Sequence, residues 1–467
     1  MHIIVDLISA VCGFLWGDLI TLPLPGGGSV GLSLLVLLLI PTGIYFTFRT
    51  RFLPLRLFPE MLRVTAEKRG GNGSAISGWQ ALIISTATRV GMGNLIGVVA
   101  AISAGGAGAV FWMWLSALIG SSTAFIEATL AQLHKKPDPL YGGYRGGPAY
   151  YIHDYFAARR NGTSRRSVTA VLFALSGLIC WCGISQVISN SVTSAFENAF
   201  RIPPIYTTVV LVALAAVIVL RKNATVKVLD VLVPIMAGCY FLMTVVLIVK
   251  NAALLPAVFQ RIFQEAFGLR QAVAGGFGAV LMNGVKRGLF SNEAGSGSAP
   301  CAAAAAKVSH PAKAGLLQAF GVILDTIVIC TCTAMIMLLA PQEALEGLSG
   351  MALLQTAMGC HFGQWGVIFV AITLWLFSFS TFIGILYYAR SNVAYLFGDR
   401  WAAQRGFQIV ALGMLFIGGL AAYTFVWDLG DIGIGLMTIF NLIAVVPMSG
   451  QAIQALKDYE SRKEELR

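Results

Sequence analysis

The sequence predicts an all-α protein that crosses a membrane many times. Its 467 residues are 57% hydrophobic and only 11% charged, and the mean hydropathy is +0.78. A soluble domain carries roughly 25% charged residues, so most of this chain is expected to lie in lipid. At about 20 residues per transmembrane helix, the chain has room for about eleven spans and for no separate soluble domain.

Eleven apolar segments fit this expectation. The predicted spans are about 29–48, 78–104, 109–133, 168–195, 205–221, 226–250, 269–287, 312–340, 363–389, 405–424 and 431–449. The segment before them, 3–22, contains Asp6 and Asp18 and lacks a basic start. We therefore expect an interfacial helix there and not a cleaved signal peptide.

The loops between the spans alternate in charge. Loops 49–77 and 134–167 are rich in Lys and Arg, whereas loop 341–362 carries Glu343 and Glu346 and no Lys or Arg. Basic loops stay on the cytoplasmic side, so we expect a bacterial-type inner-membrane protein with its N-terminus outside and its C-terminus in the cytoplasm. The net charge of +11 is thereby assigned to orientation in the lipid bilayer and not to nucleic acid, and no obligate protein partner is evident.

Glycine interrupts two of the spans. One interruption is at 91–94 and the other at 275–278. Bare peptide groups at bilayer depth are tolerated only where they face protein or a water-filled cavity. We interpret the first interruption as an opened helix that holds a small solute and a cation; the alternative is that the glycines only let two helices pack closely.

The two interruptions fall in the first span of two successive groups of five. Such a pair is the pattern of an inverted-repeat transporter with its site at the midplane. Because five is odd, the two halves must lie upside down to one another. The predicted organisation is an N-terminal segment with an extra helix and a basic loop, two five-helix repeats with broken first and sixth core helices, and a cytoplasmic tail, at 1–77, 78–250, 251–450 and 451–467.

Four motifs resemble those of the alanine/glycine:cation symporter family. They are R-V-G-M-G-N from Arg89, G-G-A-G-A-V-F-W-M-W from Gly105, Y-R-G-G-P-A-Y-Y from Tyr144 and R-G-L-F-S-N-E-A-G from Arg287. The resemblance runs from about Ser29 to Ser449. It implies the leucine-transporter fold with one helix before the ten-helix core, and uptake of small neutral amino acids coupled to Na⁺ or H⁺.

A bound amino acid needs groups for both of its charges. Free N–H groups at the start of a half-helix suit the carboxylate, and carbonyls at 274–277 would suit the ammonium group. Phe277 matches a pocket aromatic of the related fold, with ordinary packing as the alternative. Gln186 and Asn190 share one face of a helix and flank the site, although Asn190 could instead bond a neighbouring helix. The predicted substrate-binding set is Gly91, Met92, Gly93, Asn94, Gln186, Asn190, Gly276 and Phe277.

The resemblance also implies a Na⁺ site. Its ligands would be the carbonyls of Ala87 and Val90 and the hydroxyls of Ser380 and Thr381, although Ser and Thr in transmembrane helices usually bond their own backbone. A second sodium site needs a threonine where this chain has Ala272. We therefore predict a single coupled cation.

Charged side chains within spans are costly and mark functional or paired groups. Arg89 could pair an acid and latch an inner gate, or snorkel to the surface. Asp325 could carry a proton or organise Ser and Thr around it, and Glu293 is expected in a loop after the sixth core helix as a gating residue. Glu127 is expected to be a structural partner.

The sequence shows no nucleotide-binding motif, no metal triad and no nucleophile set, so we expect neither an enzyme nor an organic cofactor. A membrane channel is the rival function. Many members of the family carry tryptophan where this chain has Ile385, and a glutamate where it has Arg390. Loss of a bulky ring would leave room for a larger amino acid, such as glutamine.

Overall fold

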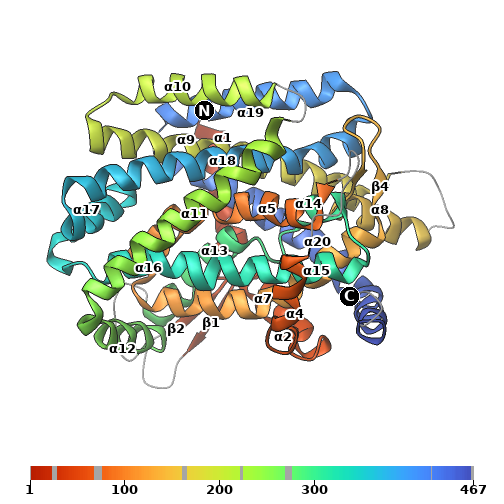
Figure 1. Cartoon of the computed structure of the whole chain (residues 1–467), viewed down its shortest axis with the longest axis horizontal. Helices are drawn as coiled ribbons and strands as arrows, with labels where there is room; N and C mark the ends of the chain where they lie inside the picture. Colours follow the sequence, from red (N-terminus) through yellow and green to blue (C-terminus); the bar gives the residue numbers. More distant parts are fainter. Residues whose placement is uncertain are drawn as a thin grey trace.

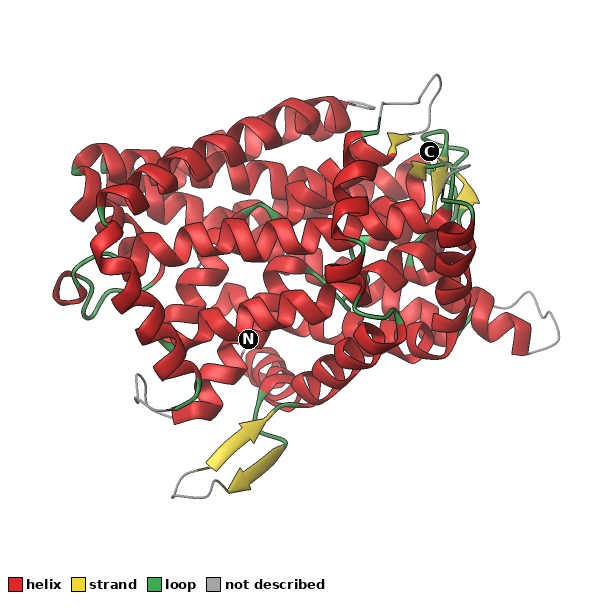
Figure 2. Cartoon of the chain, turned by 60° about the horizontal axis from the view of Figure 1, so that its bottom comes forward, coloured by secondary structure: helices red, strands yellow, loops and turns green. Residues whose placement is uncertain are grey.

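The computed structural model describes residues 2–23, 29–67, 76–159, 166–220, 224–268, 276–421 and 423–463. Long helices lie side by side and form one bundle (Figure 1), and short strand pairs project at its edges (Figure 2). The elements of the first part are α1 (His2–Trp16), β1 (Ile20–Pro23), β2 (Ser29–Leu32), α2 (Leu34–Arg49), α3 (Leu53–Arg56), α4 (Phe58–Ala66), β3 (Ile76–Ser77), α5 (Gly78–Arg89), η1 (Gly93–Gly97), α6 (Val98–Gly105), α7 (Gly108–Leu133), β4 (Lys136–Pro137), β5 (Tyr144–Arg145), α8 (Pro148–Arg159), α9 (Val168–Phe200), α10 (Pro204–Val219), α11 (Ala224–Lys250), η2 (Ala252–Leu254) and α12 (Leu255–Ala266).

The second part repeats the alternation of long helices and short connections. Its elements are α13 (Gly276–Asn292), α14 (Pro300–Ala305), β6 (Ala306–Lys307), α15 (Pro311–Ile323), η3 (Leu324–Cys330), α16 (Thr331–Leu338), η4 (Gln342–Ala344), α17 (Gly350–Phe362), α18 (Gln364–Phe397), α19 (Trp401–Leu420) and α20 (Tyr423–Ser461). The strands pair as β1 with β2 and β4 with β5, both antiparallel, and β3 with β6 in parallel.

Local sequence explains several helix ends. Ser77 accepts a hydrogen bond from the Gln80 backbone, and the Gln80 side chain accepts one from the Ser77 backbone, which is a capping box at the start of α5. Gly106 and Gly398 end α6 and α18 with positive φ angles of 68° and 76°, a conformation that glycine adopts without a steric penalty.

Each of the eleven predicted spans overlaps a helical segment. By length and apolar composition, seven described helices are able to cross a membrane, or eight if α5 and the helix beginning at Gly93 count as one broken span. The helices α2 and α10 have 16 residues each, which is short for a bilayer core about 30 Å thick. The described structure is therefore that of a multi-pass helical membrane protein, and eleven spans, ten of them in two inverted groups of five, remain a prediction.

The charged connections separate to opposite ends of the bundle. Figure 1 shows β4, α8 and the C-terminus at one end, and α12 and α17 at the other. The first end carries Lys135, Lys136 and Arg145, whereas Glu343 and Glu346 lie just before α17. This is the separation that the charge pattern of the loops predicts.

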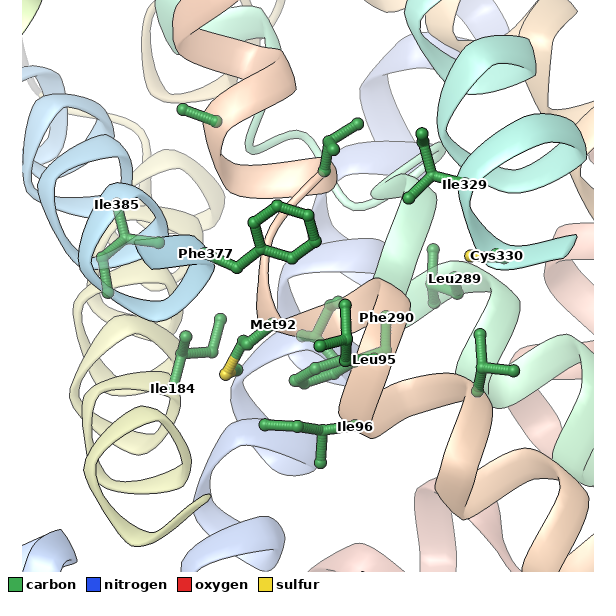
Figure 3. Packing of buried hydrophobic residues seen from close by; sticks show 14 of the residues in the cluster. Met92, Leu95, Ile96, Ile184, Leu289, Phe290, Ile329, Cys330, Phe377 and Ile385 are labelled. Atoms are coloured by element: carbon green, nitrogen blue, oxygen red, sulfur yellow. The ribbon is translucent and has the colours of Figure 1, made fainter. Parts of the chain in front are cut away.

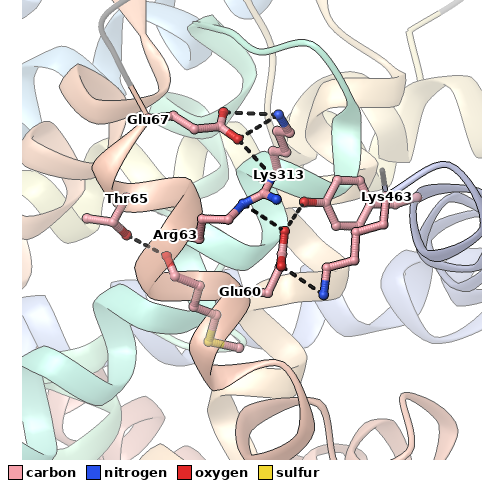
Figure 4. Close-up of polar contacts among 8 residues, drawn as sticks. Glu60, Arg63, Thr65, Glu67, Lys313 and Lys463 are labelled. Carbon is pink, nitrogen blue, oxygen red and sulfur yellow. Dashed lines mark hydrogen bonds and ion pairs between the residues drawn. The ribbon is translucent and has the colours of Figure 1, made fainter. Parts of the chain in front are cut away.

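At the basic end, the C-terminal part of α20 is bonded to α4. The Glu60 carboxylate accepts from Tyr459 Oη at 2.7 Å and pairs with Lys463 at 2.8 Å and Arg63 at 3.3 Å (Figure 4). Glu67, at the end of α4, pairs with Lys313 of α15 at 2.8 Å. These contacts hold α4 against α15 and the C-terminal part of α20.

We expect Glu60→Gln to lower the melting temperature of the purified protein at pH 7. Burial alone would raise the pKa of Glu60, but its bonds with Lys463 and Tyr459 hold that pKa below the ordinary value of 4.5. A carboxyl group with a lowered pKa stabilises the fold above its ordinary pKa, and this contribution is lost as the pH falls through the lowered value. The difference in melting temperature from wild type should therefore shrink below pH 4.5.

The matched control is Glu343→Gln, because Glu343 lies exposed in η4 at the opposite end. It should melt with the wild type at every pH. A Glu60→Gln protein that does so too would contradict the stabilising role of this cluster.

Candidate functional site

The first predicted interruption is present. The helix α5 ends at Arg89, η1 begins at Gly93, and the two helical pieces are bent by 43°. Figure 3 shows this opened stretch beside the ring of Phe377. The Gly91 N–H donates to Asn94 Oδ1 at 3.2 Å, and the Met92 N–H donates to Thr381 Oγ1 at 3.3 Å. Side chains thus replace helical partners at the break.

Glycine is required at this break because other chains approach it closely. A Cβ atom at Gly91 would lie 1.9 Å from Thr381 Oγ1, and one at Gly93 would lie 3.2 Å from Ser291 Cα. These positions bring α18 and α13 against the opened backbone. The glycines therefore also let neighbouring helices pack closely, which was the alternative interpretation. Both features are present at this break.

Asn94 joins the break to a buried carboxylate. Its Nδ2 donates to Asp325 Oδ1 at 2.7 Å, and Asp325 Oδ2 accepts from Ser291 at 2.9 Å and from Thr326 at 2.8 Å. Asn94 and Asp325 are both fully buried. Asp325 lies in η3, a π-helical stretch, and such bulges within α-helices are frequent at functional sites. Asp325 thus accepts from two hydroxyl groups, and its role as an organising group or a proton carrier stays a prediction.

The second predicted interruption, at 275–278, lies at the edge of the described residues. Gly276 and Phe277 begin α13, while residues 269–275, with Ala272 and Ala274, lie outside the described part of the chain. Phe277 packs on Trp112, with ring centroids 5.8 Å apart, which matches the packing alternative. The interruption that faces the first break lies at 293–299, between α13 and α14.

This second break is buried although its sequence is polar. Glu293, Gly295 and Gly297 have positive φ angles of 57°, 92° and 81°, and every residue from 291 to 306 is buried. Glu127 accepts from the Gly295 N–H at 3.1 Å, and Asn441 donates to the Gly295 carbonyl at 3.0 Å. These contacts satisfy the opened backbone, so Glu127 has the structural role expected of it.

Glu293 lies in the connection directly after α13, as expected, and this connection is the buried break. Its carboxylate is 3.5 Å from Thr88 Oγ1 and 3.4 Å from Tyr388 Oη, and those two hydroxyls are 2.6 Å apart. Sequence reasoning missed Thr88, Ser291 and Tyr388. A usable signal was the run S-N-E-A-G-S-G, which repeats the glycine and asparagine content of the first break.

The predicted cation ligands are partly brought together. The Ala87 carbonyl lies 3.4 Å from Ser380 Oγ and 3.3 Å from Thr381 Oγ1, and both hydroxyls also bond the Phe377 carbonyl at 2.9 Å. Val90 is buried at the same break. Phe377 precedes Ser380 and Thr381 by one turn of α18, so these are the bonds to their own backbone that were the stated alternative for the two hydroxyls. Among the described residues, no group of three His, Cys, Asp or Glu side chains is arranged for a metal ion.

Arg89 is fully buried beside the first break. Its Nη1 donates to Gln318 Oε1 at 3.0 Å, whereas its Nε and Nη2 have no hydrogen-bond partner within the described chain. No acid in the described ranges pairs with it within 4.0 Å. The snorkelling alternative is wrong because the side chain points into the bundle.

Gln186 and Asn190 face α19. Gln186 Nε2 lies 3.2 Å from Met414 Sδ, and Asn190 Nδ2 donates to the Ala421 carbonyl at 2.7 Å. Gln186 Oε1 is buried without a hydrogen-bond partner. From α9, it is Ile184 that joins Met92 in the apolar cluster around the break (Figure 3). A role for Gln186 and Asn190 in binding stays a prediction.

The fold is that of a multi-pass helical membrane protein with opened, buried stretches at its centre. The structure resembles that of the manganese transporter of Eremococcus coleocola in complex with an aromatic bis-isothiourea substituted compound, with a TM-score of 0.52 and 14% identity over 84% of this chain and 81% of that one. At this identity the likeness concerns the fold alone.

The sequence assigns the family. The profile of the sodium:alanine symporter family matches residues 27–467, and the chain belongs to that family. It is 44% identical over 434 residues to a probable sodium/glutamine symporter of Bacillus subtilis (strain 168), covering 92% of this chain and 88% of that protein. It is 34% identical over 468 residues to the sodium/alanine symporter of Methanococcus maripaludis, covering 99% and 98%.

Proposed function

We propose that this protein takes up small neutral amino acids together with a cation, Na⁺ or H⁺, by alternating access around the two breaks. The observation that carries this proposal is that the opened stretches at 90–92 and 293–299 face each other in the buried centre. Transporters built from inverted repeats place substrate and ion between such discontinuous helices. The cytoplasmic side is the end with the basic loops and the C-terminus.

Helix ends supply both charges that the substrate needs. The N-terminal end of η1, at Met92, Gly93 and Asn94, carries positive partial charge and suits the carboxylate. The C-terminal end of α13, at Phe290–Asn292, carries negative partial charge and suits the ammonium group. In this proposal the α13 carbonyls replace those predicted at 274–277, since the facing break lies elsewhere.

The cation occupies the oxygen cluster between α5 and α18. Its ligands are the carbonyls of Ala87, Val90 and Phe377 and the hydroxyls of Ser380 and Thr381. The C-terminal end of α5 adds negative partial charge there. The absence of a second cation site was predicted from Ala272. Because the facing break lies at 293–299, residue 272 no longer bears on that prediction. The stoichiometry of one cation is part of the proposal and follows from this single cluster.

A larger substrate is the second candidate. Ile385 is 1% exposed within α18 and stands where many relatives carry tryptophan, and one relative is named a probable sodium/glutamine symporter. In this proposal Ile385 borders the substrate, and its side chain, smaller than that of tryptophan, leaves room for an amide. Alanine and glutamine are therefore the two amino acids to compare first.

Proteoliposomes with an inward Na⁺ gradient test the function. We expect saturable accumulation of alanine or glutamine against its own gradient, abolished when Na⁺ is equal on both sides at constant pH. Flux without accumulation would instead indicate a channel. A panel of competing amino acids then ranks substrates, and replacing the Na⁺ gradient by a proton gradient identifies the coupled ion.

Binding to the purified protein should be reciprocal. If Na⁺ stabilises the opened α5–η1 stretch, it raises the affinity for the amino acid, and the amino acid must raise the affinity for Na⁺ by the same factor. Calorimetry with each ligand in the absence and presence of the other measures both factors. Two independent affinities would rule out coupling through this site.

A further inference from the structure

A cluster of charges joins α13 to α20 outside the site just described. Asp431 Oδ2 lies 2.7 Å from Lys286 Nζ, and Asp431 Oδ1 lies 3.3 Å from Arg287 Nη1. The three side chains are 3%, 15% and 12% exposed. Removing one partner from such a buried group leaves an uncompensated charge, which is costly. We therefore expect Asp431 to separate from Lys286 and Arg287 together, and not from one of them alone.

The cluster lies between the breaks and the end of the bundle opposite the basic loops. Asp431 is eight residues after Tyr423, so it lies about 12 Å along α20 from its start, and the far end of α20 is at the basic end. Lys286 and Arg287 are in the last two turns of α13 before the second break. In the proposed transporter, a substrate that enters from the extracellular side has to pass Lys286, Arg287 and Asp431 before it reaches the breaks.

An aromatic layer fills the space between the charges and the first break. The Arg287 guanidinium lies over the Trp427 ring at 4.2 Å, and the Trp427 and Phe290 ring centroids are 5.0 Å apart. The Phe290 ring lies 3.8 Å from the position of a Cβ atom on Gly93. The layer thus rests directly on the opened helix.

Helix α1 covers this cluster from the N-terminal segment. Trp16 Nε1 donates to the Asp431 carbonyl at 3.0 Å, and Lys286 Nζ lies 5.1 Å from the Trp16 ring centroid. Trp16 is only 6% exposed. Leu15 lies 3.1 Å from the position of a Cβ atom on Gly435, so glycine there lets α1 lie directly on α20.

We infer that Lys286, Arg287 and Asp431 form the closed extracellular gate of the transporter and that α1, through Trp16, is the strap that holds this gate shut. The inference rests on the proposed function, because it takes the facing breaks as the site and the basic end as cytoplasmic. Trp16 is a positioning residue: it touches the gate charges and does not touch the breaks. Opening requires the α13–α20 pairs to separate and α1 to release Asp431.

The native thiol of Cys330 reports on the gate. Its Sγ lies 3.1 Å from Ser291 Oγ and 3.5 Å from Asn94 Nδ2, and the residue is 3% exposed. Cys301 is 2% exposed in α14, beyond the second break toward the cytoplasmic side. An impermeant maleimide applied to spheroplasts, with no amino acid added, should reach Cys330 only through an opened gate, and peptide mass spectrometry quantifies each thiol separately.

We expect Trp16→Ala and Asp431→Asn to label at Cys330 roughly tenfold faster than wild type, as for the loss of one buried hydrogen bond or ion pair, with Cys301 unchanged. Trp16→Phe keeps a ring for Lys286 but loses the N–H donor, so it should fall between. Trp365→Ala is the control, because Trp365 is 80% exposed near the start of α18 and should leave labelling unchanged.

Unchanged Cys330 labelling in Asp431→Asn and Trp16→Phe would contradict the proposed gate. A parallel increase in Cys301 labelling would contradict it too, because it would indicate general loosening of the fold. The assay needs no substrate. Absence of amino-acid accumulation by the wild-type protein would therefore count against the proposed function, and the labelling result would stand separately.

Discussion

Gly91→Ala should reduce Na⁺-driven amino-acid uptake by roughly ten- to a hundredfold, since overpacking costs about 1–3 kcal/mol and each 1.4 kcal/mol is a factor of ten. The new Cβ would lie 1.9 Å from Thr381 Oγ1, 3.0 Å from the Thr88 carbonyl and 3.1 Å from the Ala87 carbonyl. Thr381 must move, and the proposed cation cluster moves with it. Initial uptake rates in proteoliposomes and the Na⁺ affinity of the purified protein measure the effect.

The control for this substitution is Gly413→Ala. Gly413 lies in α19, and no atom is within 4 Å of a Cβ atom placed there. Both variants add one methyl group to a helical membrane segment, so insertion and yield should be equal. If uptake by Gly91→Ala is within twofold of uptake by Gly413→Ala, the contact between α5 and α18 is not part of the transport site.

Asp325→Ala should abolish uptake. The substitution leaves the donors on Asn94, Ser291 and Thr326 without their shared acceptor, and each buried unpaired group costs about 1–3 kcal/mol. Because Asn94 also accepts from the Gly91 N–H, the loss reaches the first break directly. Asp325→Asn keeps the shape and one acceptor oxygen, so comparing the two variants separates the charge from the hydrogen bonds.

The two possible roles of Asp325 give different results. If Asp325 carries a proton, Asp325→Asn uptake becomes independent of a proton gradient. If Asp325 only organises the break, Asp325→Asn retains part of the activity and its dependence on the coupled ion. Glu343→Gln, at an exposed acid far from the breaks, is the control for removing one negative charge. Wild-type uptake by Asp325→Ala would exclude both roles.

The first break could be predicted from sequence because its signal is local. Glycines at 91 and 93 around Asn94 conflict with a membrane helix, and the structure opens the chain there. The break that faces the first one was not predicted, because two glycine-rich stretches follow α12 and local composition does not tell which of them faces the first break. Burial decides it: the polar run at 293–299 lies inside the bundle, where Glu127 and Asn441 satisfy its backbone.

The contacts that side chains make could not be predicted from sequence, even where the helix that carries them was predicted. Gln186 and Asn190 do share one face of α9, but that face meets α19. Ser380 and Thr381 do approach the Ala87 carbonyl, because α18 crosses α5 at the break. The periodicity of a helix determines which residues point the same way, and it contains no information on what stands opposite.

The sequence by itself determined that this chain is a multi-pass membrane protein of the sodium:alanine symporter family, opened near Gly91, with its charged loops sorted to two ends. These features follow from composition and motifs, which are read along the chain. Only the tertiary structure decided where the second break lies, that Asp325 accepts from Asn94 and Ser291 of two other segments, and that Trp16 covers Asp431, 415 positions further along the chain. Contacts between residues so distant in sequence arise from the packing of whole helices, which no local pattern encodes.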